Sequence, residues 1–302
     1  MSLLESASNI LFTVKHHEFS FTGDDFKRIS SLIYQRAGIC LPPGKAEMVY
    51  NRLSRRLRAL GLTSFSSYLT LLTGNGSTEW DHFIGALTTH LTAFFREEHH
   101  FPILAAHAAR KAGSGRVRIW SCAASTGEEP YSMAISMADQ FDTLYPPVEI
   151  MATDVDPGVL ETARRGVYPI ESLKTVPSRI LKRYFLRGDG NNKGFVKVRP
   201  EVQQMITFGP LNLLAPIWPL STRYDAIFCR NVLIYFDKPT QKRVLHHCQR
   251  YLAPDGLFFA GHSENLAHVA DLLDPCGKTV YRPRQSQSEY TPEAPFGDEC
   301  YA

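Results

Sequence analysis

VRIWSCAASTGEEPYS, residues 117–132, is the stretch that decides the fold of this chain. Its first part, 117–122, is an apolar run of the length and composition typical of a buried strand. The polar turn that follows carries two adjacent carboxylates, Glu128 and Glu129, and a helix is predicted over 128–142. The stretch therefore predicts a strand–turn–helix unit with acidic residues at the turn.

A second run, VEIMATD at 148–154, predicts a strand that ends on Asp154. In an open α/β sheet, ligands bind at the carboxyl ends of the strands, and an acidic residue there can hold the hydroxyls of a nucleoside. Acidic residues follow both predicted strands. The sequence therefore predicts an enzyme with a nucleoside cofactor.

The alternation of strands and helices continues along the chain. Asp156-Pro157 predicts a helix that ends at Gly166, and a strand at 224–229, a helix at 239–252 and a strand at 257–260 follow. We therefore expect a doubly wound α/β domain with a parallel sheet covered on both faces.

Two further segments complete the organisation. YFLRGDGNNKGFVKVRPEV (184–202) has three glycines and an alternating run, which predicts a small β subdomain over about 185–206. In the first ninety residues, apolar residues recur at helical spacing and the predicted helices end at glycines. We expect a helical domain over 1–90, the α/β domain over 91–284, and a polar, disordered tail over 285–302.

The composition bounds the class of protein. The chain has 302 residues, 44% of them hydrophobic, which suffices for a large core in two domains. The net charge of +3 does not indicate a nucleic-acid partner. The six cysteines form no CxxC pair or His/Cys cluster, so we expect buried thiols and no metal. No run is long enough for a membrane span and no signal peptide is recognisable, which predicts a soluble, cytoplasmic protein.

The turn after the first strand distinguishes between cofactor classes. It contains one glycine, Gly127, and lacks the G-x-G-x-x-G pattern with which dinucleotide enzymes approach a pyrophosphate. Glu128 and Glu129 would repel a pyrophosphate but suit S-adenosylmethionine, which carries a sulfonium, an ammonium and free ribose hydroxyls. The residues therefore favour a methyltransferase over a nucleotide-dependent oxidoreductase.

Several segments stand in the order and spacing of the CheR-type chemotaxis-receptor methyltransferases. They are HLTAFFREEHHFP (90–102), WSCAASTGEEPYSMA (120–134), ATDVDPGVLETARRGVY (152–168), NLL (212–214), FCRNVLIYF (228–236) and PDGLFFAGHSE (254–264). YQRAGI (34–39) and MVYNRLSRRLRALGL (48–62) resemble the N-terminal helical domain of that family. The resemblance covers residues 20–283, nearly the whole chain.

The resemblance implies a class I S-adenosylmethionine-dependent methyltransferase fold behind a helical domain that docks the substrate. The implied activity is that of a protein-glutamate O-methyltransferase, which forms methyl esters on glutamates of bacterial chemoreceptors for chemotactic adaptation. S-adenosylhomocysteine would be the product. A glutamate carboxylate has a pKa of about 4.3 and is already ionised at neutral pH, so in-line alignment matters more than a general base.

The resemblance also implies roles for individual residues. Asp154 would hold the ribose hydroxyls, and Glu129, Thr92 and Arg96 would surround the methionine end. Asn212, Leu213, Arg230 and Asn231 would line the adenine and the rest of the cofactor pocket, and Tyr235 would lie near the methyl group. The predicted catalytic residues are Arg96, Arg230 and Tyr235.

Each of these residues also has a simpler interpretation. Glu128 and Glu129 are favourable at a helix N-terminus because of the helix dipole. Asp154 can cap the following helix, Arg96 can form a surface ion pair, and Tyr235 can belong to the core.

One position departs from the family pattern. Where the family has asparagine before TAFFR, this chain has His90, which we also expect at the cofactor. A neutral imidazole offers one donor and one acceptor, but it adds a titratable charge. Because a protonated His90 beside a sulfonium would weaken binding, we expect weaker or pH-sensitive cofactor binding. This departure also supports an alternative function, a non-catalytic S-adenosylmethionine-binding signalling module.

Two features predict how the substrate docks. Segment 45–60 carries five basic residues against one glutamate, and Arg52, Arg55, Arg56 and Arg58 would steer the enzyme towards an acidic surface. The insertion with Gly188, Gly190 and Gly194 resembles the β subdomain with which some family members bind a receptor's C-terminal peptide by strand addition. The alternatives are a solvated basic face and a flexible loop.

The expected partner is the cytoplasmic domain of chemotaxis receptors. We expect a monomer, no nucleic-acid partner and no membrane insertion. An RNA methyltransferase would use the same cofactor and a basic helix, but the sequence contains no recognisable nucleic-acid module.

Overall fold

The computed structural model of the chain describes residues 17–284, so the tail predicted over 285–302 lies outside the described residues. Its α-helices are α1 (Gly23–Ala37), α2 (Ala46–Leu60), α3 (Phe65–Thr73), α4 (Glu79–Leu87), α5 (His100–Lys111), α6 (Glu128–Gln140), α7 (Pro157–Arg165), α8 (Ser178–Tyr184), α9 (Pro200–Gln203) and α10 (Lys238–Tyr251). Its strands are β1 (Val117–Ser121), β2 (Val148–Asp154), β3 (Val167–Pro169), β4 (Phe185–Arg187), β5 (Phe195–Val198), β6 (Ile206–Pro210), β7 (Tyr224–Cys229), β8 (Leu252–Ala260), β9 (Leu273–Gly277) and β10 (Val280–Pro283).

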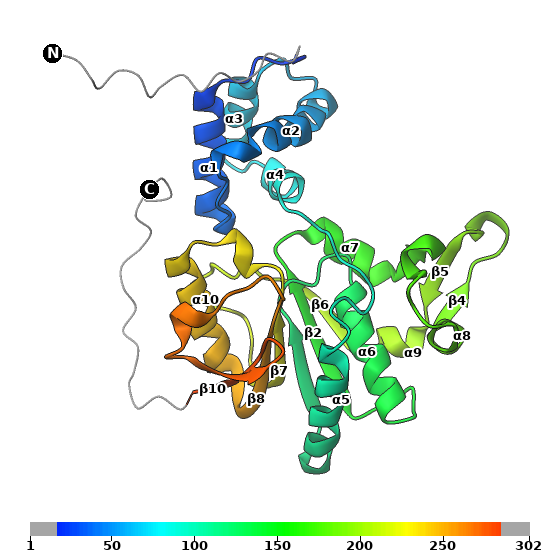
Figure 1. Cartoon of the computed structure of the whole chain (residues 1–302). Helices are drawn as coiled ribbons and strands as arrows, with labels where there is room; N and C mark the ends of the chain where they lie inside the picture. The colour runs from blue at the N-terminus through cyan, green and yellow to red at the C-terminus, as the bar shows by residue number, and fades with distance from the viewer. Residues whose placement is uncertain (1–16, 285–302) are drawn as a thin grey trace.

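Helices α1 to α4 form a separate helical layer above the sheet domain, as the blue and cyan ribbons of Figure 1 show. The first helix illustrates how the sequence sets its bounds. The Thr22 side chain and Asp25 form a reciprocal capping box at its start, and Gly38 ends it in the left-handed region at φ 68°. Its apolar face, which includes the fully buried Ile29 and Ile33, packs into the core of the helical domain.

The main sheet has seven strands in the order β6-β2-β1-β7-β8-β10-β9. The first five are parallel, and β10 pairs antiparallel with both β8 and β9. The predicted α/β class is confirmed, but the sheet is mixed because the chain ends its last strand pair as a hairpin. That hairpin turns through Lys278 and Thr279, both at positive φ, and has no glycine at either of these positions to signal it.

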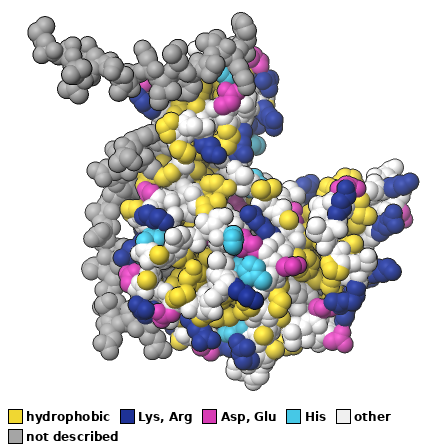
Figure 2. Space-filling view, viewed as in Figure 1, with side chains coloured by type: hydrophobic (Ala, Val, Ile, Leu, Met, Phe, Trp, Pro, Cys, Tyr) yellow, Lys and Arg dark blue, Asp and Glu magenta, His cyan; other side chains and the backbone are white. Residues whose placement is uncertain are grey.

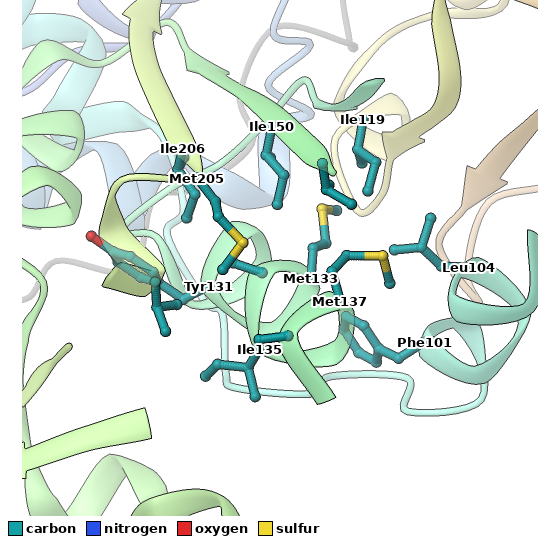
Figure 3. Close-up of a cluster of buried hydrophobic side chains, with 14 of the residues drawn as sticks. Phe101, Leu104, Ile119, Tyr131, Met133, Ile135, Met137, Ile150, Met205 and Ile206 are labelled. Atoms are coloured by element: carbon teal, nitrogen blue, oxygen red, sulfur yellow. The ribbon is translucent and has the colours of Figure 1, made fainter. Parts of the chain in front are cut away.

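Both faces of the sheet are covered, because alternate residues of each strand enter different cores. On β1, Ile119 enters the core that includes α5 and α6, whereas Trp120 enters the core that includes α10. Figure 3 shows the first of these cores, where methionines of α6 such as Met133 and Met137 meet Ile119 and Ile150 of the sheet. This arrangement makes the domain doubly wound. Because β6, β2, β1, β7 and β8 are parallel, their carboxyl ends lie at one edge of the sheet.

A second, small sheet has the order β3-β5-β4 and projects from the main domain together with α8 (Figure 1). Two of its strands lie in the predicted β subdomain over 185–206, but β3 at 167–169 comes from an earlier part of the chain. Because β3 has only three residues, it is too short for an alternating pattern to predict it from the sequence. The inner residues of β5, such as Val196 and Val198, are buried, whereas Phe195 is exposed.

The helical layer is joined to the sheet domain by hydrogen bonds at the end of α1. The Tyr34 hydroxyl donates to Asp237 at 2.7 Å, and the Cys40 amide donates to the Tyr235 carbonyl at 2.9 Å. The Asn212 side chain donates to the Arg36 carbonyl at 2.7 Å. These bonds hold the helical layer over the carboxyl ends of the parallel strands.

Candidate active site

A pocket lies between the helical layer and the carboxyl ends of the parallel strands. The strand ends contribute Cys122, Asp154 and Arg230, and the start of α6 contributes Glu129. The opposite wall comes from the end of α1 and from the segment 87–93 that follows α4. The pocket is therefore at the edge where open α/β sheets bind ligands. Its lining residues are Ala37, Ile39, Leu87, Thr88, Thr89, His90, Leu91, Thr92, Ala93, Arg96, Phe101, Cys122, Ala123, Ser125, Glu129, Asp154, Val155, Leu211, Asn212, Leu213, Arg230, Asn231, Val232, Tyr235 and Phe236.

Asp154 lies at the end of β2 with 8% of its surface exposed. Its carboxylate accepts hydrogen bonds from the Ser125 amide at 2.8 Å and from the Asp156 amide at 3.0 Å. Burial raises the pKa of this carboxyl despite these two bonds. The carboxylate lines the pocket on rigid backbone, which suits it to accept hydrogen bonds from the hydroxyls of a ligand. The residue that caps the start of α7 is Asp156, not Asp154. The Asp156 carboxylate accepts a hydrogen bond from the Gly158 amide at 2.7 Å.

The buried Arg230 and the partly buried Glu129 form an ion pair in the pocket wall. Glu129 Oε2 lies 3.2 Å from Arg230 Nη1, and Glu129 Oε1 accepts a hydrogen bond from the Ser121 hydroxyl at 2.8 Å. Burial raises the pKa of Glu129, although Arg230 opposes this shift. Arg230 Nη2 donates to the Arg96 carbonyl at 2.5 Å, while its Nε and Nη1 are buried without a hydrogen-bond acceptor in the described part of the chain. The pair therefore presents charged groups with unused hydrogen-bonding capacity.

Glu128 does not line the pocket, although it is adjacent to Glu129 in the sequence. Its carboxylate accepts a hydrogen bond from the Thr126 hydroxyl at 2.7 Å at the start of α6, and burial raises its pKa. The simpler interpretation, a carboxylate at a helix N-terminus, fits the position of Glu128.

The segment after α4 brings three predicted residues to the pocket: His90, Thr92 and Arg96. His90 Nε2 lies 2.7 Å from the Thr88 hydroxyl and 3.1 Å from Asp156 Oδ2, with about a quarter of its side chain exposed. The Arg96 guanidinium donates to the Leu91 carbonyl at 2.7 Å. His90 is therefore anchored beside the start of α7, and Arg96 reaches the pocket from a partly exposed position.

The remaining predicted residues follow β6 and β7. Asn212 and Leu213 line the pocket after β6, and the Asn212 amide is held by the Arg36 carbonyl. Asn231 adopts φ 58°, and Tyr235 lies in the short helix Leu233–Tyr235. The structure thus brings all of the predicted cofactor-binding and catalytic residues to one pocket.

Two glutamates that the sequence pattern did not indicate, the buried Glu264 and the partly buried Glu97, shape the turn after β7. Glu264 accepts hydrogen bonds from the amides of Val232, Leu233 and Gly261. Glu97 accepts from the Asn231 side chain at 3.3 Å and from the His262 amide at 3.1 Å. All of these bonds except the one from Gly261 to Glu264 span more than 30 residues of sequence, so no local pattern indicated them.

The predicted docking residues on α2 have different surroundings. Arg56 donates to both Glu79 oxygens at 2.7 and 2.8 Å, and Arg52 donates to the Thr88 carbonyl at 2.6 Å. Arg58 donates to Glu18 at 2.8 Å on the surface, and Arg55 is exposed. Two of the four arginines therefore stabilise the helical domain itself.

The predicted glycines lie in the connection between β4 and β5. Gly190 and Gly194 have positive φ of 50° and 94°, and a Cβ on Gly188 would lie 2.2 Å from the Asn192 carbonyl oxygen. The connection therefore requires glycine for its shape. Lysine and arginine side chains are spread over this subdomain in Figure 2.

Within residues 17–284, no cluster of three or more histidine, cysteine or acidic side chains could hold a metal ion. The helices in that range are all too short or too polar to cross a membrane. The pocket instead offers carboxylates, two guanidinium groups and apolar side chains. That set suits a nucleoside with both positive and negative groups, and it fits S-adenosylmethionine, whose ammonium, sulfonium and carboxylate need such partners.

Comparison with known proteins gives matches over both parts of the chain. Residues 24–88 match the family described as CheR methyltransferase, all-alpha domain, and residues 90–282 match CheR methyltransferase, SAM binding domain. The chain is 51% identical over 269 residues to chemotaxis protein methyltransferase 2 of Pseudomonas aeruginosa, covering 89% of this chain and 96% of that protein. It is 55% identical over 257 residues to the chemotaxis protein methyltransferase of Escherichia coli, covering 85% of this chain and 89% of that protein.

Proposed function

The chain belongs to the CheR methyltransferase family and is an S-adenosylmethionine-dependent methyltransferase of chemotaxis, and from this premise we propose that it methylates glutamate side chains of chemoreceptors. The product would be a glutamate methyl ester, with S-adenosylhomocysteine released. The observation that carries the proposal is the convergence of Asp154, Glu129 and Arg230 in one pocket at the strand ends.

The binding residues divide the cofactor between them. When bound, S-adenosylmethionine supplies a methyl group activated by a sulfonium. We assign the ribose hydroxyls to Asp154 and the adenine to the segment around Asn212 and Leu213, which line the pocket beyond the end of β2. Glu129, with Arg96 and Thr92, would hold the methionine end.

The substrate needs orientation and not deprotonation, because a glutamate carboxylate is already an anion at neutral pH. Arg96 is partly exposed at the pocket, so we assign it to the incoming carboxylate. The Arg230 side chain is only 1% exposed, which favours a role in holding Glu129. Tyr235, whose carbonyl is fixed by the Cys40 amide, would direct the approach to the methyl group.

The reaction is tested by incubating the protein with S-adenosylmethionine and chemoreceptor cytoplasmic fragments, and by locating added methyl groups with mass spectrometry. Methyl groups on glutamates of the receptor helices support the proposal. Replacement of these glutamates by aspartate in the receptor should abolish the methylation detected by mass spectrometry. Methylation of other residue types, or of added RNA, contradicts it. Cofactor binding without transfer to any receptor would favour the non-catalytic signalling module.

We further propose that the small β3-β5-β4 sheet captures a C-terminal receptor peptide. Both β3 and β4 are edge strands, so a peptide strand can add to the sheet through backbone hydrogen bonds. The outer face carries Val167, Leu186 and Phe195, each 40–44% exposed, around Lys197. A peptide with apolar side chains and a free carboxylate would complement this face.

Calorimetric titration with receptor tail peptides tests the capture step. We expect a dissociation constant in the micromolar range for a peptide with a free C-terminal carboxylate and weaker binding for its amide. Absence of binding at millimolar peptide concentrations would remove this part of the proposal.

A further inference from the structure

Glu97 is a second carboxylate on Arg230, largely shielded from solvent, and it has no place in the chemistry assigned above. Its Oε2 lies 3.4 Å from Arg230 Nη2, on the guanidinium that also pairs with Glu129. Its side chain is 14% exposed, and the residue is not part of the pocket lining. Glu97 therefore acts on the pocket from behind Arg230.

The backbone at Glu97 lies in the left-handed region at φ 54°, where glutamate is uncommon. Hydrogen bonds from the Asn231 side chain and the His262 amide hold its carboxylate in this position. Strained residues of this kind persist where the surroundings fix them, and they cluster at functional sites. The position of this carboxylate is therefore closely specified.

The charges around Arg230 show what Glu97 adds. Burial opposes ionisation of Glu97, but Arg230 and the hydrogen bonds outweigh it and lower the pKa of the carboxyl, so it is an anion at neutral pH. His100 Nδ1 lies 3.9 Å from Glu97, but burial lowers the pKa of this histidine to about 4 and keeps it neutral. Arg96 is the other cation that acts on Glu129, and it is partly exposed.

Two carboxylates thus share the buried guanidinium. If Glu97 were neutral, Arg230 would pair with Glu129 alone and cancel its charge. With both carboxylates ionised, the group of Arg230, Glu97 and Glu129 carries one net negative charge; Glu97 raises the pKa of Glu129, so the group favours a ligand cation that compensates this charge. A ligand with a sulfonium in addition to its ammonium gains more from that charge than a ligand with the ammonium alone.

We propose that Glu97 is a positioning residue that neutralises Arg230, leaves Glu129 as a charged carboxylate, and so favours the sulfonium cofactor over its uncharged-sulfur product. The inference rests on the cofactor assignment above. S-adenosylmethionine and S-adenosylhomocysteine differ by one methyl group and one positive charge, so their relative affinities report the charge of the pocket.

The test is isothermal titration of wild-type protein and the Glu97→Gln variant with S-adenosylmethionine, S-adenosylhomocysteine and sinefungin, which carries an ammonium in place of the sulfonium. Glu97→Gln should weaken the two ligands with a cation at the sulfur position about tenfold and change S-adenosylhomocysteine, which keeps only the ammonium, less than threefold, as expected for the loss of one partly screened charge. Glu98 is the exposed neighbour, so Glu98→Gln is the matched control and should change no affinity more than twofold.

An equal loss of affinity for all three ligands would show that Glu97 is merely structural and would overturn the inference. Thermal unfolding establishes that each variant is folded, and Glu97→Asn supplies a second neutral variant because asparagine tolerates positive φ. If the wild-type protein bound none of the three ligands, the proposed function would fail and the inference with it.

Discussion

Asp154 shows at the scale of one residue how the pocket is prepared for its ligand. Its carboxylate is buried and held by two backbone amides, yet it retains acceptor capacity on the pocket side. Hydrogen bonds to a charged carboxylate are stronger than those between neutral groups. A rigid carboxylate of this kind can bind a ribose with little loss of conformational freedom.

Replacement of Asp154 by alanine should therefore weaken cofactor binding by about 1.5–3 kcal/mol. Calorimetric titration with S-adenosylhomocysteine measures the loss. Asp142→Ala, at a side chain that is 85% exposed, is the control and should leave the affinity unchanged. Unchanged affinity in a folded Asp154→Ala variant would contradict the assignment of the ribose.

His90 should make cofactor binding sensitive to pH. Burial opposes ionisation of Asp156, but the hydrogen bond from His90 and those from the backbone lower the pKa of its carboxyl, so Asp156 stays charged above pH 6. The test compares pH 8 with pH 6, because an imidazolium at position 90 would add a positive charge to the pocket wall. The affinity for S-adenosylmethionine should fall over this range in the wild type and stay flat in His90→Asn. Parallel pH profiles would refute this role.

The residues at the strand ends could be predicted because strand, turn and helix signals are local and the binding edge of the fold is known. Glu129 and Asp154 were found in this way, whereas Arg230 was predicted from the family resemblance. Glu97 and Glu264 could not be, because their partners are distant in the sequence and their backbone geometry leaves no pattern. The contacts of Arg52 and Arg56 within the helical domain could not be predicted either, because their partners are also distant in the sequence.

At the scale of elements, α2 has a structural role in the helical domain besides the docking role predicted for it. Arg56 and Tyr68 both donate to Glu79, which is 4% exposed at the start of α4. The ion pair between Arg56 and Glu79 joins α2 to α4 and so helps to position the segment that leads from α4 into the pocket. Regular elements such as α1 and β2 were predicted because their periodicity and caps are clear. The short β3 and the β9–β10 hairpin lack such signals.

Arg56→Met should destabilise the protein by about 3 kcal/mol because it leaves the buried Glu79 without its cation. Burial opposes ionisation of Glu79, but Arg56 lowers the pKa of the carboxyl below its unfolded value. The stabilisation by the pair is therefore present above the unfolded pKa and is lost as the pH falls through the folded pKa. Urea unfolding should therefore show a large difference in unfolding free energy between the wild type and Arg56→Met at pH 7, and a smaller difference at pH 3.

The exposed neighbour Arg55 supplies the control for this measurement. Arg55→Met should change the unfolding free energy by less than about 0.5 kcal/mol. An equal effect of the two substitutions would show that the loss comes from the surface charge of α2 and not from the buried pair.

At the scale of the whole molecule, the pocket belongs to both layers. Ala37 and Ile39 come from the helical layer, and Asp154 and Arg230 come from the sheet domain. A receptor that docked on the helical layer would contact a part of the protein that also lines the pocket. The separation of the chain into two folding patterns was predicted, but the joint between them was not, because it depends on single hydrogen bonds such as that from Tyr34 to Asp237.

Loosening this joint should weaken cofactor binding although the altered residue does not line the pocket. Tyr34→Phe removes the hydroxyl that donates to Asp237 at 2.7 Å, and we expect a loss of about 1 kcal/mol in affinity for S-adenosylhomocysteine. Tyr145→Phe, at a residue that is 72% exposed, is the control for loss of a hydroxyl. Identical titrations for the two variants would indicate that the helical layer does not support the pocket.

The most direct test of the central claim is transfer of radiolabelled methyl groups from S-adenosylmethionine to membranes that contain chemoreceptors, followed by mild alkali. A protein-glutamate O-methyltransferase should leave label on the receptor that is released as volatile methanol, which is the behaviour of a carboxyl methyl ester. Label that resists alkali, or that is absent from receptor while the cofactor binds, would contradict it.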